Sequence, residues 1–226
     1  MNQLLAVVIP LSLGAAVSPT GLAVVILTLS GKVAPRARAW AEVAGVVIAL
    51  TVVTALLAVF ARAILSFKPN PTVMGTTDVV AGLLLLGLAV HTVLRRKDGE
   101  GGRRKKRAPG DKAGAALGAY FLVGLALLVT DVTSLVLYFP ALKDIALAEG
   151  VSPEAKLAVA AIPYFAVIAP MLVPTVMASL APDLTDRALK PFGEWVDGHS
   201  KMIGLVVELV FGVFLLAKGG LKLAGR

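Results

Sequence analysis

The stretch LLAVVIPLSLGAAVSPTGLAVVILTLS, residues Leu4–Ser30, is apolar and carries no charged side chain. It is long enough to cross a bilayer core of about 30 Å, which requires about 20 apolar residues in a helix. A secretory signal peptide places positive residues before its apolar region. Here no Lys or Arg precedes Lys32, so we interpret the stretch as a retained first membrane span.

Further apolar blocks follow in the 226-residue chain, at about residues 39–65, 78–94, 113–142, 155–180 and 202–217. Hydrophobic residues make up 58% of the chain and charged residues only 16%, whereas soluble domains have about 25% charged residues. The blocks are continuously apolar rather than alternating, which favours helices over the strands of a membrane barrel. The sequence therefore predicts an all-α polytopic membrane protein with six transmembrane helices.

A charged linker, RRKDGEGGRRKKRAPGDK at residues 95–112, carries +6 of the net charge of +8. Basic residues collect in cytoplasmic loops, which predicts a multi-pass protein with this linker in the cytoplasm and both termini outside. The linker lacks interleaved aromatic residues, so nucleic-acid binding is not expected. Its most basic run either sets the topology or attracts anionic lipid headgroups: Arg103, Arg104, Lys105, Lys106 and Arg107.

The linker also divides the spans three and three. We therefore predict a first repeat at residues 1–94, the linker at 95–112 and a second repeat at 113–226. Because three is odd, the second repeat is inverted relative to the first. Transporters built in this way often have a broken helix in each half and a substrate site near the membrane midplane.

Each predicted half begins with a span that contains a polar interruption. In the first, Ser18-Pro19-Thr20 precedes a glycine, and proline removes a helical hydrogen bond. In the second, Asp131 lies between Thr130 and Thr133, and a membrane-embedded carboxylate often marks an ion or substrate path. The sequence leaves open a simple packing kink at the first interruption and a helix cap at the second.

Three other acidic residues lie in or next to apolar blocks. Glu208 is a candidate for proton coupling together with Asp131, or else a structural, hydrogen-bonded residue. Glu42, close to Arg36 and Arg38, is expected in a surface ion pair. Asp78 is expected in the first turn of the third span or as its cap. We expect the substrate or ion pathway to include Ser18, Pro19, Thr20, Thr130, Asp131, Thr133 and Glu208.

The composition excludes several kinds of chemistry. The chain has no cysteine and only two histidines, so disulfides, iron–sulfur clusters and histidine-rich metal sites are not expected. No nucleophile–base pair or phosphate-binding glycine loop is recognisable. We therefore expect no enzymatic activity, no cofactor and no bound metal.

Two neighbouring segments carry a family resemblance: AAVSPTGLAVVILTLSG (Ala15–Gly31) and APRARAWAEVAGVVIAL (Ala34–Leu50). A Ser-Pro in the first span, then Pro-Arg-x-Arg and a small-residue helix, resembles the GAP or sulfolipid-addressing branch of the LysE-type exporter superfamily, found in actinobacteria. An Asn-Pro-Lys-like motif of that superfamily would fall at Thr130–Thr133, where this chain has Thr-Asp-Val-Thr.

The resemblance implies export of a cell-envelope lipid, glycolipid or small amphiphile, with membrane lipids and envelope-lipid export machinery as partners and a homodimer as one form. Alternating access between the two halves is the expected mechanism, with proton coupling as an option. Two alternatives stay open: a non-transporting scaffold for a lipid exporter, and an exporter of amino acids or metal ions.

Overall fold

The computed structural model of the protein describes residues 1–31, 33–65, 71–97, 117–184, 187 and 190–225. Within these residues the chain forms helices and no strand. In chain order the helices are α1 (Asn2–Ala16), α2 (Pro19–Leu29), α3 (Pro35–Leu65), α4 (Pro71–Lys97), α5 (Leu117–Thr130), α6 (Val132–Leu147), α7 (Pro153–Leu180), α8 (Pro182–Leu184) and α9 (Lys190–Leu223).

Four single helices contain a stretch that is long and apolar enough to cross a membrane: Pro35–Val59, Gly75–Leu94, Pro153–Leu180 and Gly198–Leu223. The other two predicted spans are each divided into two helices, with a bend of 45° between α1 and α2 and of 68° between α5 and α6. When each bent pair crosses as one, the described residues give six spans. The prediction of an all-α polytopic membrane protein is confirmed.

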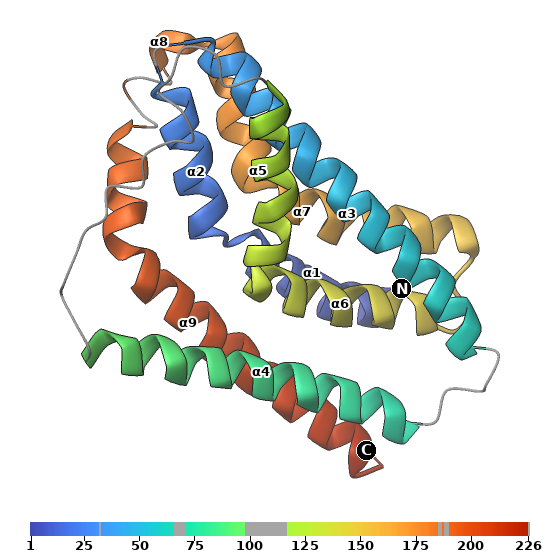
Figure 1. Ribbon diagram of the computed structural model, residues 1–226. Coiled ribbons are helices and arrows are strands. Elements are labelled where there is room, and N and C mark those ends of the chain that lie inside the picture. The colour runs from blue at the N-terminus through green and yellow to red at the C-terminus, as the bar shows by residue number, and fades with distance from the viewer. Residues whose placement is uncertain (32, 66–70, 98–116, 185–186, 188–189, 226) are drawn as a thin grey trace.

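The most extensive helix contacts join the part of the chain before the linker to the part after it (Figure 1). Helix α4 lies along α9, and α3 lies along α5. Helix α1 packs against both α6 and α7, while α2 packs against α7 and α9. The interior of the molecule is therefore formed between the two halves of the sequence rather than within each half.

Glycines allow the closest of these approaches. A side chain at Gly45 of α3 would strike the backbone of α5, and one at Gly124 of α5 would strike the carbonyl oxygen of Glu42. Helices α4 and α9 meet in the same way at Gly82 and Gly212. Small residues at such crossings bring helix backbones together and increase van der Waals contact, which fixes α3 on α5 and α4 on α9.

Large apolar side chains also cover the outside of the molecule, as is expected where lipid tails replace water. They lie on each of the long helices, among them Val52, Leu56, Leu83, Leu84, Val90, Leu122, Leu157, Val206, Val210 and Val213. The interior is apolar as well, and its fully buried side chains include Leu11, Leu50, Leu85, Leu137 and Leu215. Polar residues within the spans are therefore the exceptions that require an explanation.

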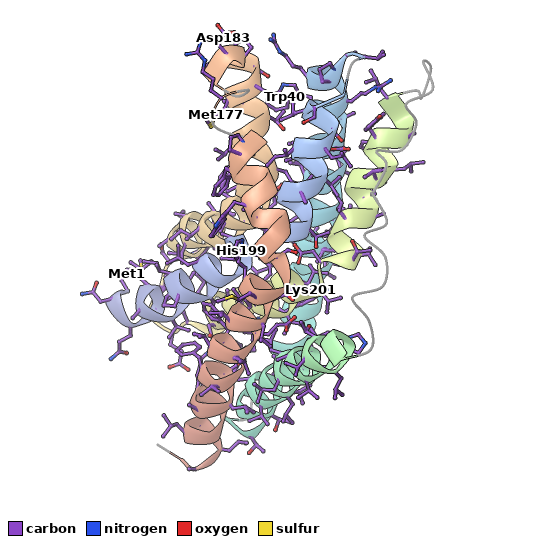
Figure 2. The ribbon with its side chains drawn as sticks, turned by 90° about the vertical axis from the view of Figure 1, so that its left-hand side faces the viewer. Met1, Trp40, Met177, Asp183, His199 and Lys201 are labelled. Carbon is purple, nitrogen blue, oxygen red and sulfur yellow. The ribbon has the colours of Figure 1, made fainter. Side chains whose placement is uncertain are left out.

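The last span is longer than its apolar block predicts. The mixed-charge segment 182–201 precedes that block, and it contributes α8 and the first third of α9. Figure 2 shows Trp40 and Asp183 near one end of the molecule, whereas Lys201 lies about midway along it. Helix α9 has 34 residues and at 1.5 Å per residue is about 51 Å long, which exceeds the thickness of the bilayer core.

The prediction about Asp78 in the third span is wrong, and the predictions about the linker fall mostly outside the described residues. Helix α4 begins at Pro71, so Asp78 lies two turns inside the helix and the expectation of a capping residue is wrong. Helix α4 continues through Arg95 to Lys97. The rest of the linker lies outside the described residues, including Arg103, Arg104, Lys105, Lys106 and Arg107.

Candidate functional site

The break in the first span exposes a backbone carbonyl that the second half of the chain binds. In a continuous helix, the N–H of residue 19 would donate to the carbonyl oxygen of Ala15, but Pro19 has no N–H. The fully buried hydroxyl of Ser134, on α6, donates to that oxygen at 2.9 Å. One hydrogen bond therefore joins the break between α1 and α2 to the beginning of α6, the helix that follows the break between α5 and α6.

The two breaks use the same local chemistry to start a new helix. The Ser18 Oγ accepts a hydrogen bond from the Gly21 N–H at 3.1 Å, at the beginning of α2. The Asp131 Oδ1 accepts one from the Ser134 N–H at 3.4 Å, at the beginning of α6. Side-chain caps of this kind satisfy N–H groups that have no partner within the helix. Asp131 is therefore a helix cap, one of the two roles that the sequence left open.

The Asp131 carboxylate is held in place by a second contact. Its Oδ2 lies 2.8 Å from the Ser134 Oγ, which also donates to the Ala15 carbonyl. A serine hydroxyl has one proton, so this proton is shared between the carboxylate of one break and the carbonyl of the other. The Ser134 side chain therefore couples the two breaks, because a change in the position of either one alters a hydrogen bond of this hydroxyl.

A small cavity lies between the two breaks. Its volume is about 20 Å³, which is room for about one water molecule. Its lining combines residues of both breaks with apolar side chains of the neighbouring helices: Ser18, Gly21, Val46, Leu127, Leu128, Asp131, Val167, Pro170 and Met171. The cavity is far too small for a lipid or a solute, so this conformation is closed around the breaks.

The other predicted pathway residues do not all reach this cavity. Thr20 is exposed and Pro19 is half-buried, and neither lines it. Thr130 is exposed, and its hydroxyl donates to the Leu127 carbonyl of its own helix at 3.0 Å. The structure thus brings Ser18 and Asp131 to one place and leaves both flanking threonines, Thr20 and Thr130, outside it.

Glu208 forms a separate polar contact on α9. Its side chain is almost completely buried, and Thr92 of α4 lies 3.4 Å from its Oε2 as a hydrogen-bond donor. Thr133 of α6 also interacts with this carboxylate. Glu208 therefore links α9 to α4 and, through Thr133 in the first turn of α6, to the second break. It does not line the cavity.

A cluster of charged residues that the sequence did not reveal lies where α4, α6 and α9 meet. Asp78 is fully buried, and it pairs with Lys143, with Lys218 at 3.3 Å and with Lys222 at 3.1 Å. Asp144 pairs with the two lysines of α9, with Lys222 at 3.3 Å. Three ammonium groups therefore surround two carboxylates. Buried charges need such partners to offset the loss of hydration.

The sequence held a partial signal of this cluster. Asp78 is the only Asp or Glu within residues 71–94, so it needs a partner if it is buried. Lys218 and Lys222 are four residues apart and lie on one face of a helix. What the sequence could not supply was the packing of α4 along α9 and against α6, which brings these residues together.

A second buried carboxylate, Glu42 on α3, has a different environment. Glu42 is fully buried, so the expectation of a surface ion pair with Arg36 or Arg38 is wrong. Its Oε1 accepts a hydrogen bond from the Thr28 hydroxyl of α2 at 2.7 Å. The Arg38 guanidinium lies over the ring of Tyr120 on α5, 4.9 Å from its centre.

The comparison with known families covers both breaks and all the spans. The family model of the sulfolipid-1-addressing protein, Sap, matches residues 8–220. This chain belongs to the sulfolipid-1-addressing protein family. The resemblance of residues 15–50 to that branch is therefore confirmed, and it extends across both halves of the chain. Membership of the wider LysE-type superfamily stays a prediction.

No curated protein and no solved structure matches the chain significantly. The candidate site is therefore identified from the contacts within this structure alone. Two groups of these contacts stand out: the paired helix breaks around the small cavity, and the buried carboxylates of α3, α4 and α9.

Proposed function

We propose that this protein moves an amphiphilic lipid of the cell envelope across the bacterial inner membrane by alternating access between its two halves. The family is named after a sulfolipid, and an amphiphile with an anionic headgroup is the substrate class that we infer for this chain. The observation that carries the proposal is the hydrogen bond from Ser134 to the Ala15 carbonyl, which joins the two helix breaks.

Broken helices suit such a transport site for a physical reason. Backbone groups without a helical partner are tolerated at membrane depth only where they contact protein or a water-filled cavity. Here the breaks at Ser18 and Asp131 line one small cavity. In the proposal this small cavity is the point around which the halves rock, opening alternately to the two sides of the membrane.

The pairing of helices supports an inverted repeat. Suppose that α1, α2, α3 and α4 correspond to α5, α6, α7 and α9. The contact of α3 with α5 then corresponds to that of α7 with α1. In the same way, the contact of α2 with α9 corresponds to that of α6 with α4. The contact of α2 with α3 corresponds to that of α6 with α7. All of these contacts are present, as expected if the two halves are equivalent, whereas the contact of α1 with α6 has no counterpart of similar extent between α5 and α2.

We further infer that both termini face outward and that the basic linker faces the cytoplasm, because Lys and Arg are concentrated there. Membrane lipids and the envelope-lipid export machinery are the inferred partners, and a homodimer is the inferred assembly. A protein that only holds such machinery together is the competing function, and it differs in needing a partner for any lipid movement.

The test uses the full chain reconstituted into liposomes of neutral and anionic phospholipid. A fluorescent analogue of an acidic glycolipid is placed in one leaflet, and its arrival in the other is followed by chemical quenching. Translocation by the protein alone is expected. Translocation that appears only with a cell-envelope partner would indicate the scaffold, and none under either condition would contradict a role in lipid movement.

Substitution at the second break sharpens this test. Asp131→Asn keeps a cap of similar shape but removes the ionisable group, so we expect lipid movement, or its pH dependence, to be lost while the protein stays folded. Asp183→Asn, at an exposed position of α8, is the matched control and should transport normally. Undiminished transport with an unchanged pH profile in Asp131→Asn would exclude this role of Asp131.

A further inference from the structure

The surroundings of Glu42 suggest a ligand that none of the contacts described above supplies. Its side chain is 0% exposed, within the apolar stretch Pro35–Val59. Thr28 donates a hydrogen bond to Oε1 at 2.7 Å, whereas Oε2 has no hydrogen-bonding partner among the described residues. A fully buried carboxyl group with one oxygen unpaired is the least satisfied polar side chain in the described part of the protein.

The charged and titratable groups around Glu42 do not compensate an ionised carboxylate. On its own helix Arg38 lies over the ring of Tyr120, the only ionisable side chain in α5, and forms no ion pair with Glu42. Helix α2 has no ionisable side chain. The phenols of Tyr138 on α6 and Tyr164 on α7 bond to threonines farther along α3: Thr54 and Thr51.

The remaining charged groups of the helices that pack against α3 have other partners. Lys143 and Asp144 belong to the cluster around Asp78. Lys156, near the beginning of α7, donates to the Ala146 carbonyl, and Glu154 lies in the first turn of the same helix. An ionised carboxylate that is buried without a cation is strongly disfavoured, and such a group becomes neutral instead.

We propose that Glu42 is a proton-binding site of this protein, and that it carries its proton in the closed conformation described here. The ligand is a proton rather than a metal ion, because the single donor Thr28 and an apolar surround give a cation too few oxygen ligands. The proposal rests on the proposed transport function for its role in coupling, but not for the protonation itself.

The position of Glu42 connects this proton to the helix breaks. Helix α3 is fixed on α5 by the glycine contacts at Gly45 and Gly124. Thr28, in contrast, lies on α2, beyond the break at Ser18. A change in the bend between α1 and α2 therefore moves Thr28 relative to Glu42.

Opening of the cavity would also bring water close to this carboxyl group. Val46 lines the cavity and lies one helical turn from Glu42, on the same face of α3. Once Thr28 withdraws and water enters, the O–H bond of the carboxylic acid breaks and its proton passes to a water molecule. A carboxylate and a hydronium ion are left, and the reverse transfer closes the cycle.

Infrared spectroscopy of the full protein in lipid tests the protonation directly. A protonated carboxyl group has a C=O stretching band that an ionised one lacks. We expect such a band at neutral pH in the wild type, a loss of its intensity in Glu42→Gln, and an unchanged band in Asp183→Asn. Thr28→Val should shift the band to higher frequency, because the carbonyl oxygen loses its hydrogen bond.

The outcomes of this measurement are distinguishable. The absence of the band at neutral pH, or a band of unchanged intensity in Glu42→Gln, would overturn the proposal and would indicate that Glu42 is ionised. Since no transport is measured, failure of the proposed transport function leaves this result standing.

Transport in liposomes then tests the coupling. The wild-type rate is expected to change at least tenfold across the neutral pH range, and that of Glu42→Gln to be independent of pH over the same range. A pH profile of Glu42→Gln identical to that of the wild type would overturn the coupling role. Thr28→Val is the second variant, and it should shift the midpoint of the profile while retaining a pH dependence.

Discussion

Asp78 and Glu42 are both fully buried carboxyl groups on membrane-spanning helices, and their environments are opposite. Asp78 contacts three lysines from two other helices, whereas Glu42 contacts one threonine hydroxyl. The first arrangement keeps a charge inside the protein by surrounding it with opposite charges. The second has no such compensation, so it favours the neutral acid. The difference separates a structural ion cluster from a group that is able to exchange a proton.

The largest effect on stability is expected at the ion cluster. Asp78→Asn leaves three lysines beside Asp144 alone, and breaking a buried ion network in this way costs about 3–5 kcal/mol. Thermal unfolding in detergent should therefore occur at a clearly lower temperature than for the wild type. The exposed Asp183→Asn variant should unfold as the wild type does. An unfolding temperature of Asp78→Asn close to that of the wild type would show that the cluster is not needed for stability.

Substitution at the crossing of α3 and α5, next to Glu42, should lower the stability less than Asp78→Asn does. In Gly124→Ala the added methyl group meets the Glu42 carbonyl oxygen of α3, and overpacking of this kind costs about 1–3 kcal/mol. Gly118, on the same helix, has no neighbour within 4 Å of such a methyl group. Gly118→Ala should therefore be neutral or slightly more stable, and equal unfolding temperatures for the two variants would contradict the close approach of α3 and α5.

The bond between the breaks should contribute a smaller amount. Ser134→Ala leaves the buried Ala15 carbonyl without its donor, at a cost of about 1–2 kcal/mol. Ser12 is the matched control, because its hydroxyl donates to the Val8 carbonyl of its own helix, which the Ser12 N–H also satisfies. The test is whether Ser134→Ala lowers the unfolding temperature more than Ser12→Ala does.

The smallest effect on stability is expected at Glu42 itself. If Glu42 is neutral in the closed conformation, Glu42→Gln replaces one uncharged group by another of similar shape, and the free energy of unfolding should change by less than about 1 kcal/mol. Measured beside Asp78→Asn, this variant separates the two environments. A loss as large as that of Asp78→Asn would mean that Glu42 is charged and paired.

The sequence predicted those features that depend on neighbouring residues. Pro19 lacks an N–H wherever the helix lies, so an interruption at Ser18-Pro19 was visible in the sequence. A missing N–H alone does not break a helix, however, because α7 runs unbroken through Pro163, Pro170 and Pro174. The apolar blocks are local as well, and they located the spans to within about five residues, except at the beginning of α4 and at both ends of α9. Ser18 and Asp131 were identified for the same reason, since a polar residue inside an apolar block is visible without knowledge of the fold.

The sequence did not predict which of these polar residues meet. Asp78 and Lys222 are 144 positions apart, and only the packing of α4 along α9 makes them partners. Glu42 follows two arginines at the beginning of a span, which is typical of a surface ion pair. The rotation of α3 about its axis instead places the Glu42 side chain against Thr28 and the Glu42 carbonyl oxygen against Gly124. Long-range packing thus assigned the roles that local patterns left open.

The ion cluster also has a consequence for how the protein is made. Asp78 lies in the first half of the chain, and during synthesis it enters the membrane long before Lys218 and Lys222 exist. Lys143 arrives with α6, but two of the three lysines come from the end of α9. The cluster is therefore complete only when the last helix has been inserted, and until then its two carboxylates lack both lysines of α9.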